Sequence, residues 1–153
     1  MGQKLLEVAL LAFLPVSEIR GALPYGVLVR DLPFFWVVAV SFICNLLPFF
    51  LVMFALNFFL KFLLRWEWFS NFWSKYIMEA QNRFKNYEKW GKWGIMLFVG
   101  IPLPFTGVWT GSVVCFLAGL PWRESFPFIL GGLVIATFLV SLATLGGNYL
   151  LVR

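Results

Sequence analysis

Two charged residues, Glu18 and Arg20, lie in the stretch LPVSEIRGALPYG, between long runs of apolar residues. An ionisable side chain at membrane depth costs a few kcal/mol even on the most lenient insertion scale, so such residues usually serve a function. Arg20 stays charged in any environment and can bind a phosphate or carboxylate through two hydrogen bonds. Glu18, partly removed from water, is expected to carry a coupling proton. The two residue types therefore predict an anion site with a proton carrier beside it.

A structural role for the same pair stays open. Glu18 and Arg20 could neutralise each other, or they could cap the ends of broken helices. On a regular helix, side chains two apart diverge, so they would not meet one ligand. In an extended tip between Pro15 and Pro24 they would share a face, and both would reach the same ligand.

A second polar stretch, IPLPFTGVWTGS, carries no charge. It offers the hydroxyls of Thr106, Thr110 and Ser112, and Gly107 and Gly111 allow close backbone approach. Half-helices beginning at Thr106 or Thr110 would point their amides at an anion. An ordinary proline turn with small residues for helix packing is the alternative. The predicted substrate-binding residues are Ser17, Glu18, Arg20, Thr106, Gly107, Thr110, Gly111 and Ser112.

The segments that carry these residues are apolar but interrupted. Residues 5–29 contain Pro15, Gly21 and Pro24, and residues 94–120 contain Pro102 and Pro104. Each half is about 10 residues, or roughly 15 Å of helix, which reaches the middle of a bilayer and no further. We therefore predict two re-entrant hairpins whose tips are covered by protein or water, because lipid cannot satisfy exposed backbone.

Uninterrupted apolar segments follow each hairpin, at residues 33–60 and 125–152. Both exceed the roughly 20 residues that a membrane-spanning helix needs. The whole chain is 61% hydrophobic and only 12% charged, too few charges to cover a water-facing surface. The composition predicts an all-α integral membrane protein and excludes a nucleic-acid-binding one.

The region between the two halves, residues 61–92, has a surplus of lysine and arginine and is predicted to be cytoplasmic. Positions 66–87 show an apolar stripe at helical spacing, which favours an amphipathic helix in the membrane interface. Packing against a partner chain is the alternative reading of that stripe.

The order of segments predicts an inverted repeat in one membrane domain, residues 1–153. The first repeat is 1–60, the linker 61–92 and the second repeat 93–153. Pro15-Val-Ser17 matches Pro104-Phe-Thr106, and Leu32-Pro33 matches Leu120-Pro121 at nearly the same offset. Inverted repeats with broken helices are typical of transporters that bind their substrate at the midplane. Two spans and two hairpins are too few to enclose a path, so we expect a homodimer.

The sequence lacks the residues that metal binding, acid–base catalysis and nucleophilic catalysis usually need. The chain has no histidine, which removes the commonest metal ligand and the commonest general base. Cys44 and Cys115 are single residues in apolar runs and read as small hydrophobes. No pairing of nucleophile and base is evident. We therefore expect no metal, no cofactor and no enzymatic activity.

The stretches SEIRGALPYG and PLPFTGVWTGS together resemble the small multi-drug export protein family of small prokaryotic membrane proteins, over nearly the whole chain. The paired hairpins are also similar to the DedA (VTT) group. That similarity implies proton-linked translocation of lipid carriers such as undecaprenyl phosphate. The chain departs from the DedA group in its second tip, where Trp109 and Thr110 stand in place of an arginine.

The leading hypothesis is a secondary transporter or flippase of a prokaryotic plasma membrane that works by alternating access. Its partners would be membrane lipids and an amphipathic substrate, either a polyprenyl-phosphate-type lipid or another small molecule. A multidrug exporter of cations is the first alternative, since Glu18 could face the path. A membrane scaffold or accessory subunit without transport activity is the alternative from another class.

Overall fold

The chain folds into helices joined by short turns, with no strand among the residues that can be placed. The computed structural model describes residues 1–66, 70, 71, 74, 75, 78, 88–103 and 106–151. In chain order its main elements are α1 (Gly2–Phe13), α2 (Glu18–Pro24), the π-helix η1 (Tyr25–Val29), α3 (Phe34–Leu63), α5 (Glu88–Gly100), α6 (Val108–Leu117) and α7 (Trp122–Leu151).

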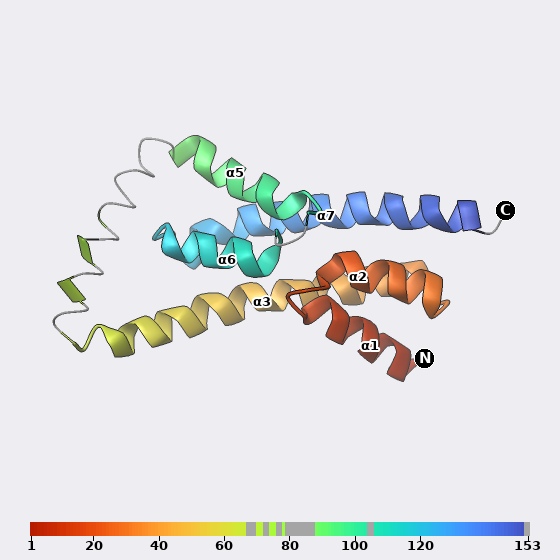
Figure 1. Cartoon of the computed structure of the whole chain (residues 1–153), viewed down its shortest axis with the longest axis horizontal. Helices are drawn as coiled ribbons and strands as arrows, with labels where there is room; N and C mark the ends of the chain where they lie inside the picture. Colours follow the sequence, from red (N-terminus) through yellow and green to blue (C-terminus); the bar gives the residue numbers. More distant parts are fainter. Residues whose placement is uncertain (67–69, 72–73, 76–77, 79–87, 104–105, 152–153) are drawn as a thin grey trace.

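The long helices α3 and α7 run in opposite directions along the long axis of the molecule (Figure 1). Both are long and apolar enough to cross a membrane, over Phe34–Phe62 and Trp122–Gly147. The predicted spans at 33–60 and 125–152 are therefore confirmed as helices, with bounds that differ by a few residues. Large apolar side chains such as Phe54, Phe58 and Phe138 are exposed on their outer faces, as expected for a surface in contact with lipid.

Two helical hairpins enter the molecule from opposite ends, and their tips meet in the middle (Figure 1). The first hairpin is α1 with α2 and η1, and the second is α5 with α6. α1 packs along α3, and α5 packs along α7. The second arm of each hairpin also contacts the other long helix, since α2 packs on α7 and α6 packs on α3. Each hairpin is thus held between the two long helices.

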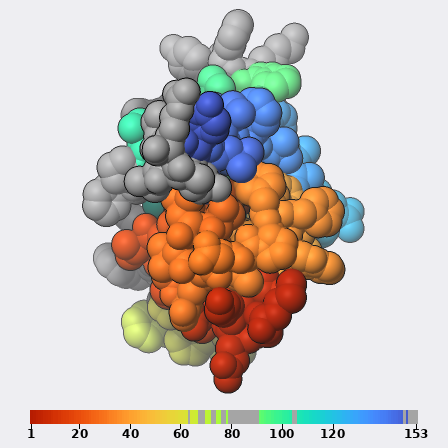
Figure 2. Space-filling model, turned by 90° about the vertical axis from the view of Figure 1, so that its right-hand side faces the viewer, coloured from red at the N-terminus to blue at the C-terminus, as the bar shows by residue number. Residues whose placement is uncertain are grey.

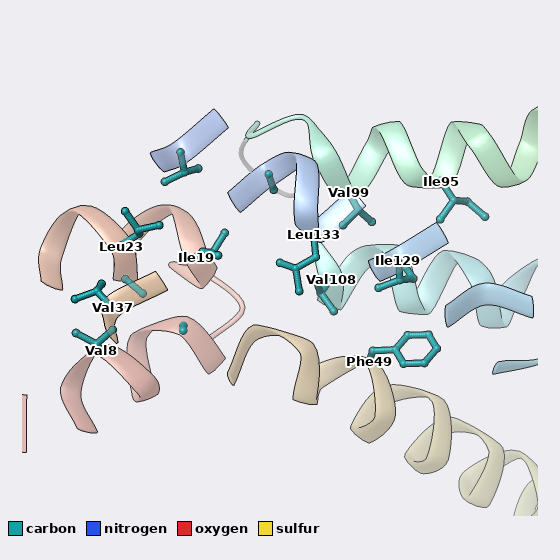
Figure 3. Packing of buried hydrophobic residues seen from close by; sticks show 14 of the residues in the cluster. Val8, Ile19, Leu23, Val37, Phe49, Ile95, Val99, Val108, Ile129 and Leu133 are labelled. Carbon is teal, nitrogen blue, oxygen red and sulfur yellow. The ribbon is translucent and has the colours of Figure 1, made fainter. Parts of the chain in front are cut away.

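The hydrophobic core follows this arrangement as one continuous cluster (Figure 3). Toward one end, Val8, Leu23 and Val37 join the first hairpin to α3. Toward the other, Val99 and Ile129 belong to the layer between the second hairpin and α7. Close van der Waals packing of these side chains holds the hairpins against the long helices, since lipid itself is apolar.

Ion pairs lie at the ends of the hairpins that point away from the tips. Arg30 forms a salt bridge with Glu7, and the Tyr25 hydroxyl donates to the same carboxylate at 2.8 Å. Lys92 pairs with Glu124 at 2.8 Å, which joins the start of the second hairpin to the start of α7. Figure 2 views the end that carries the first hairpin, with the C-terminal part of α7 beside it.

The backbone repeats unusual conformations in the two halves. The residues with positive φ are Glu18 and Asp31 in the first half, and Gly107 and Gly119 in the second. Glu18 is the first residue of α2 and Gly107 directly precedes α6, and Asp31 and Gly119 each precede a Leu-Pro pair. The interval from Glu18 to Asp31 is one residue longer than the interval from Gly107 to Gly119. The π-helix η1 absorbs that residue, because Arg30 donates to the Tyr25 carbonyl five residues back.

Several predictions fall outside the described residues or need correction. Most of the stripe at 66–87, and Pro104, lie outside the described residues. α5 begins at Glu88, within the region predicted to be linker. The prediction that Gly21 and Pro24 break the first hairpin is wrong. α2 runs through Gly21, and the chain stays helical beyond Pro24. Pro24 lacks an N–H, and the hydrogen-bond pattern changes to the wider π type directly after it.

The close contact of α5 with α7 depends on Gly132. A Cβ at this position would lie 2.6 Å from the Met96 carbonyl oxygen and 2.7 Å from the Val99 Cβ, both on α5. We expect Gly132→Ala to push the helices apart and lower the free energy of unfolding by about 1–3 kcal/mol, the usual cost of overpacking. Thermal unfolding in detergent measures this, with Gly147→Ala as the control, since a Cβ there meets nothing within 4 Å. Equal melting temperatures for the two variants would contradict the close contact.

Candidate functional site

The first tip is the turn between α1 and α2. α1 ends at Phe13, and Leu14 is extended, with φ −67° and ψ 137°. Pro15 follows and cannot donate a backbone hydrogen bond, so the helix does not continue. The Ser17 hydroxyl donates to the carbonyl of Leu11 and so satisfies one of the free acceptors at the end of α1. The predicted break at Pro15 is confirmed.

The second tip repeats this solution with different residues. α5 ends at Gly100, and residues 101–103 and 106–107 connect it to α6. The Thr106 Oγ1 lies 2.8 Å from the carbonyl oxygens of Ile101 and Leu103 and can donate its one hydrogen to either. Thr106 thus resembles Ser17 in the first tip, because each hydroxyl donates to a free carbonyl in the last turn of a helix or just beyond it. Pro102 lies in the break, as predicted.

Glu18 joins the two tips through its carboxylate. Its side chain is only 5% exposed, and its φ of 46° is in the left-handed region that side chains rarely adopt. The carboxylate faces the first backbone amides of α6, those of Val108 and Trp109, the latter at 3.5 Å. Negative charge is favoured there because the amides at a helix N-terminus are free and carry partial positive charge.

This contact changes the interpretation of the second tip. α6 begins at Val108 rather than at Thr106 or Thr110, and its amides face Glu18. The amides that were predicted to face an anion thus face a carboxylate that the protein itself supplies. The alternative in which Glu18 caps a broken helix end agrees with these contacts.

Arg20 also joins the two tips, but through a positively charged group. It lies on the helix α2 rather than in the extended segment that was predicted. Its Nη1 donates to the carbonyl of Leu103, and its Nη2 donates to the carbonyl and hydroxyl oxygens of Thr106 at 2.6 and 2.8 Å. The guanidinium thus neutralises acceptors that follow the end of α5, where positive charge is favoured. Its Nε is buried and has no partner among the described residues.

Trp109 is a contact residue that the sequence analysis did not propose as a binding residue. Its indole Nε1 donates to the Phe13 carbonyl at 2.8 Å, and the two rings meet edge to face at 5.7 Å. Trp109 is the third residue after Thr106, as Arg20 is the third after Ser17. Each of the two therefore donates from one hairpin to carbonyls at the tip of the other. Extending the match of Pro15-Val-Ser17 with Pro104-Phe-Thr106 by three residues would have found it.

A pocket of about 380 Å³ lies between the two tips. Its walls combine apolar groups, among them Val16, Leu103 and the Trp109 ring, with polar ones. Of the predicted residues, the pocket brings together Ser17, Glu18, Arg20, Thr106 and Thr110.

The remaining predicted residues do not line this pocket. Gly107 is pressed against the Glu18 carboxylate. Gly111 packs close to Val99 and Ile129, and Ser112 is fully buried, with its hydroxyl bonded to the carbonyl of Val108. Gly111 and Ser112 lie on the face of α6 that packs against neighbouring helices, which agrees with the alternative that small residues serve helix contacts.

The fold and this site define an all-helical membrane protein with interlocked helix breaks between two apolar spanning helices. Within the part of the chain that the structure describes, no cluster of three or more acidic, cysteine or histidine side chains offers a metal site.

The chain belongs to the family described as "Putative small multi-drug export protein", which matches residues 18–139. The matched segment begins at Glu18 and includes Arg20 of the first tip and Thr106 of the second. That description refers to export and names no enzymatic reaction. Comparison with curated proteins and with solved structures found no significant match.

Gly107 offers a test of the contact between the tips. Its φ is 139°, and a Cβ there would lie 2.6 Å from Glu18 Oε1. We expect Gly107→Ala to displace the carboxylate from α6 and to lower the free energy of unfolding by about 1–3 kcal/mol, the range typical of such backbone strain. The measurement is thermal unfolding beside Gly94→Ala, a glycine with nothing within 4 Å. If Gly107→Ala melts no lower than Gly94→Ala, the packing of Glu18 against Gly107 is wrong.

Proposed function

We propose that this protein is a secondary transporter of a prokaryotic plasma membrane that moves an amphipathic anion by alternating access at the pocket between the tips. Membership of an exporter family supports transport as the activity. The observation that carries the rest of the proposal is the position of Arg20, which places a cationic group on the wall of a largely apolar pocket between two broken helices.

Helix lengths support hairpins that enter the membrane without crossing it. α1 has 12 residues and α6 has 10, about 18 and 15 Å of helix, which is half of a hydrocarbon core of roughly 30 Å. α3 and α7 have 30 residues each and are long enough to cross. The hairpins point toward each other from opposite ends (Figure 1), as two re-entrant hairpins inserted from opposite sides would.

The correspondence between the halves supports an inverted repeat. Paired positive-φ residues, paired hydroxyl caps at Ser17 and Thr106, and paired crossing donors at Arg20 and Trp109 occur in the same order. Transporters built from such repeats alternate between two states in which the halves exchange conformations. Release of the bonds between the tips would open the pocket toward one side or the other.

The substrate charge follows from the two ionisable groups. Glu18 is almost fully buried and directed at the α6 amides, whereas Arg20 is only half-buried and lines the pocket. An anion is therefore favoured over a cationic drug, which would need the Glu18 carboxylate exposed to the path. A polyprenyl-phosphate-type lipid has the required head and the required apolar body.

Glu18 is placed to couple a proton to this cycle. A charged carboxylate is held by the α6 amides, and protonation removes the charge on which that attraction depends. Protonation would therefore loosen the contact between the tips, and deprotonation would restore it.

The basic segment 61–92 is proposed to lie in the cytoplasm because of its excess of lysine and arginine. A homodimer is proposed because two spans and two hairpins are few for enclosing a path, and the outer faces of α3 and α7 expose many large apolar side chains.

Native mass spectrometry of gently extracted protein tests the anion site. The wild-type protein is expected to retain an anionic lipid that Arg20→Gln loses, since glutamine can still donate to the tip carbonyls but carries no charge. Arg123→Gln is the matched control, because Arg123 is exposed and its guanidinium lies over the Trp122 ring, 5.5 Å from the centroid. Oligomer mass is read in the same spectra and tests the dimer.

Retention of the same lipids by all three proteins would refute the anion site at Arg20. Transport of cationic drugs, and the role as a scaffold, would then be tested next. A scaffold predicts that Arg20→Gln leaves cellular function intact while changes in the apolar stripe at 66–87 abolish it.

A further inference from the structure

A second pocket adjoins the first on the other side of Arg20. It has a volume of about 280 Å³ and lies between α2 and α7. Arg20 and Pro102 line both pockets, so these two side chains form the wall that they share. The other residues that line it are Pro24, Leu28, Leu139, Val140, Ala143 and Thr144.

The chemistry of the second pocket differs from that of the first. Apart from Arg20 its lining is hydrocarbon, with a single hydroxyl on Thr144. That hydroxyl donates to the carbonyl of Val140 in its own helix, at 2.8 Å, and is not available as a donor to a ligand. Away from Arg20, a polar or charged group would find no hydrogen-bond partner in this pocket, whereas an alkyl chain would contact hydrocarbon side chains.

We infer that this second pocket holds the hydrocarbon chain of an anionic amphiphile whose head group binds Arg20. The inference rests on the proposed function, because it takes the same arginine as the anion site. Two observations carry it: the two pockets meet at Arg20, and Arg20 is the charged side chain in a lining that is otherwise hydrocarbon apart from the Thr144 hydroxyl. An oxyanion at the shared wall would be attracted to the half-buried guanidinium, a group that binds phosphate and carboxylate.

The second pocket would position the hydrocarbon chain of the ligand, although the surrounding lipid could also accommodate that hydrocarbon chain. A hydrocarbon chain gains little hydrophobic free energy by moving from lipid into a protein groove, because both surroundings are apolar. What the groove supplies is position, since the head group can reach Arg20 while its chain stays in hydrocarbon. Ala143 limits the space available because a larger side chain at this position would fill the pocket.

Photo-crosslinking locates the chain directly. The full-length protein in lipid nanodiscs is incubated with a dodecyl phosphate that carries a diazirine on its chain, then irradiated and mapped by peptide mass spectrometry. Labels are expected on Leu28, Leu139 and Ala143, which line the open groove, in severalfold excess over exposed residues outside it such as Phe54. The matching dodecyl alcohol, which lacks the anionic head, is expected to label the lipid-exposed residues without that excess.

Variants distinguish the pocket from the head-group site. Ala143→Phe is expected to lower the labelling of Leu28 and Leu139 severalfold, whereas Leu142→Phe, at a neighbouring position that is 54% exposed, leaves it unchanged. Retention of ethyl phosphate, measured by native mass spectrometry, is expected to be the same in both variants and lost in Arg20→Gln.

Each outcome decides between the two proposals. If dodecyl phosphate is retained through Arg20 but labels the residues of the groove no more than exposed residues outside it, the chain pocket is wrong and the anion site stands. If inorganic phosphate displaces the probe as well as dodecyl phosphate does, the ligand is a free phosphate and the chain pocket is again wrong. If no phosphate compound is retained by the wild-type protein, the proposed function itself fails.

Discussion

The structure depends on one constraint, which is that broken helices in an apolar environment must satisfy their free backbone groups within the protein. Each tip leaves carbonyls at the end of one helix and amides at the start of the next. Here the two tips satisfy each other. Glu18 brings negative charge to the amides of α6, and Arg20 brings positive charge to carbonyls beyond α5. Together with the Trp109 bond to Phe13, these contacts fix the hairpins relative to each other at a point where the chain has no continuous helix.

The large elements could be predicted from the sequence because hydrophobic length and proline position act locally. The spanning helices and the hairpin turn at Pro15 need no knowledge of the rest of the fold. The residues that gather at the pocket were also predictable, since polar residues flank both turns. The function of each was less accessible, because the partners of Arg20 and Glu18 lie more than 80 residues away in the sequence. No local pattern states that the amides of α6 already face a carboxylate.

Two local errors have a common cause. Gly21 and Pro24 were expected to break the helix because both residues have low helix propensity in water. Packing of α2 between α3 and α7 keeps the segment helical, and the π-helical turn accommodates the proline. Gly111 and Ser112 were expected in the site because they are small or polar, yet the direction of α6 turns them toward its neighbours. In both cases tertiary packing overrides the preference of the residue.

The meeting of the tips has a consequence for the membrane potential. Across a spanning helix the potential falls over the full hydrocarbon thickness, about 30 Å. In the proposed arrangement, with two half-length hairpins inserted from opposite sides and a pocket at their tips, the insulating layer would be thinner, and a larger share of the voltage would fall across the region that holds Glu18 and Arg20. One elementary charge moved through 100 mV corresponds to about 2.3 kcal/mol. A displacement of Arg20 or of the Glu18 proton by a few ångströms would therefore do electrical work, and the electric field would bias which side of the pocket opens.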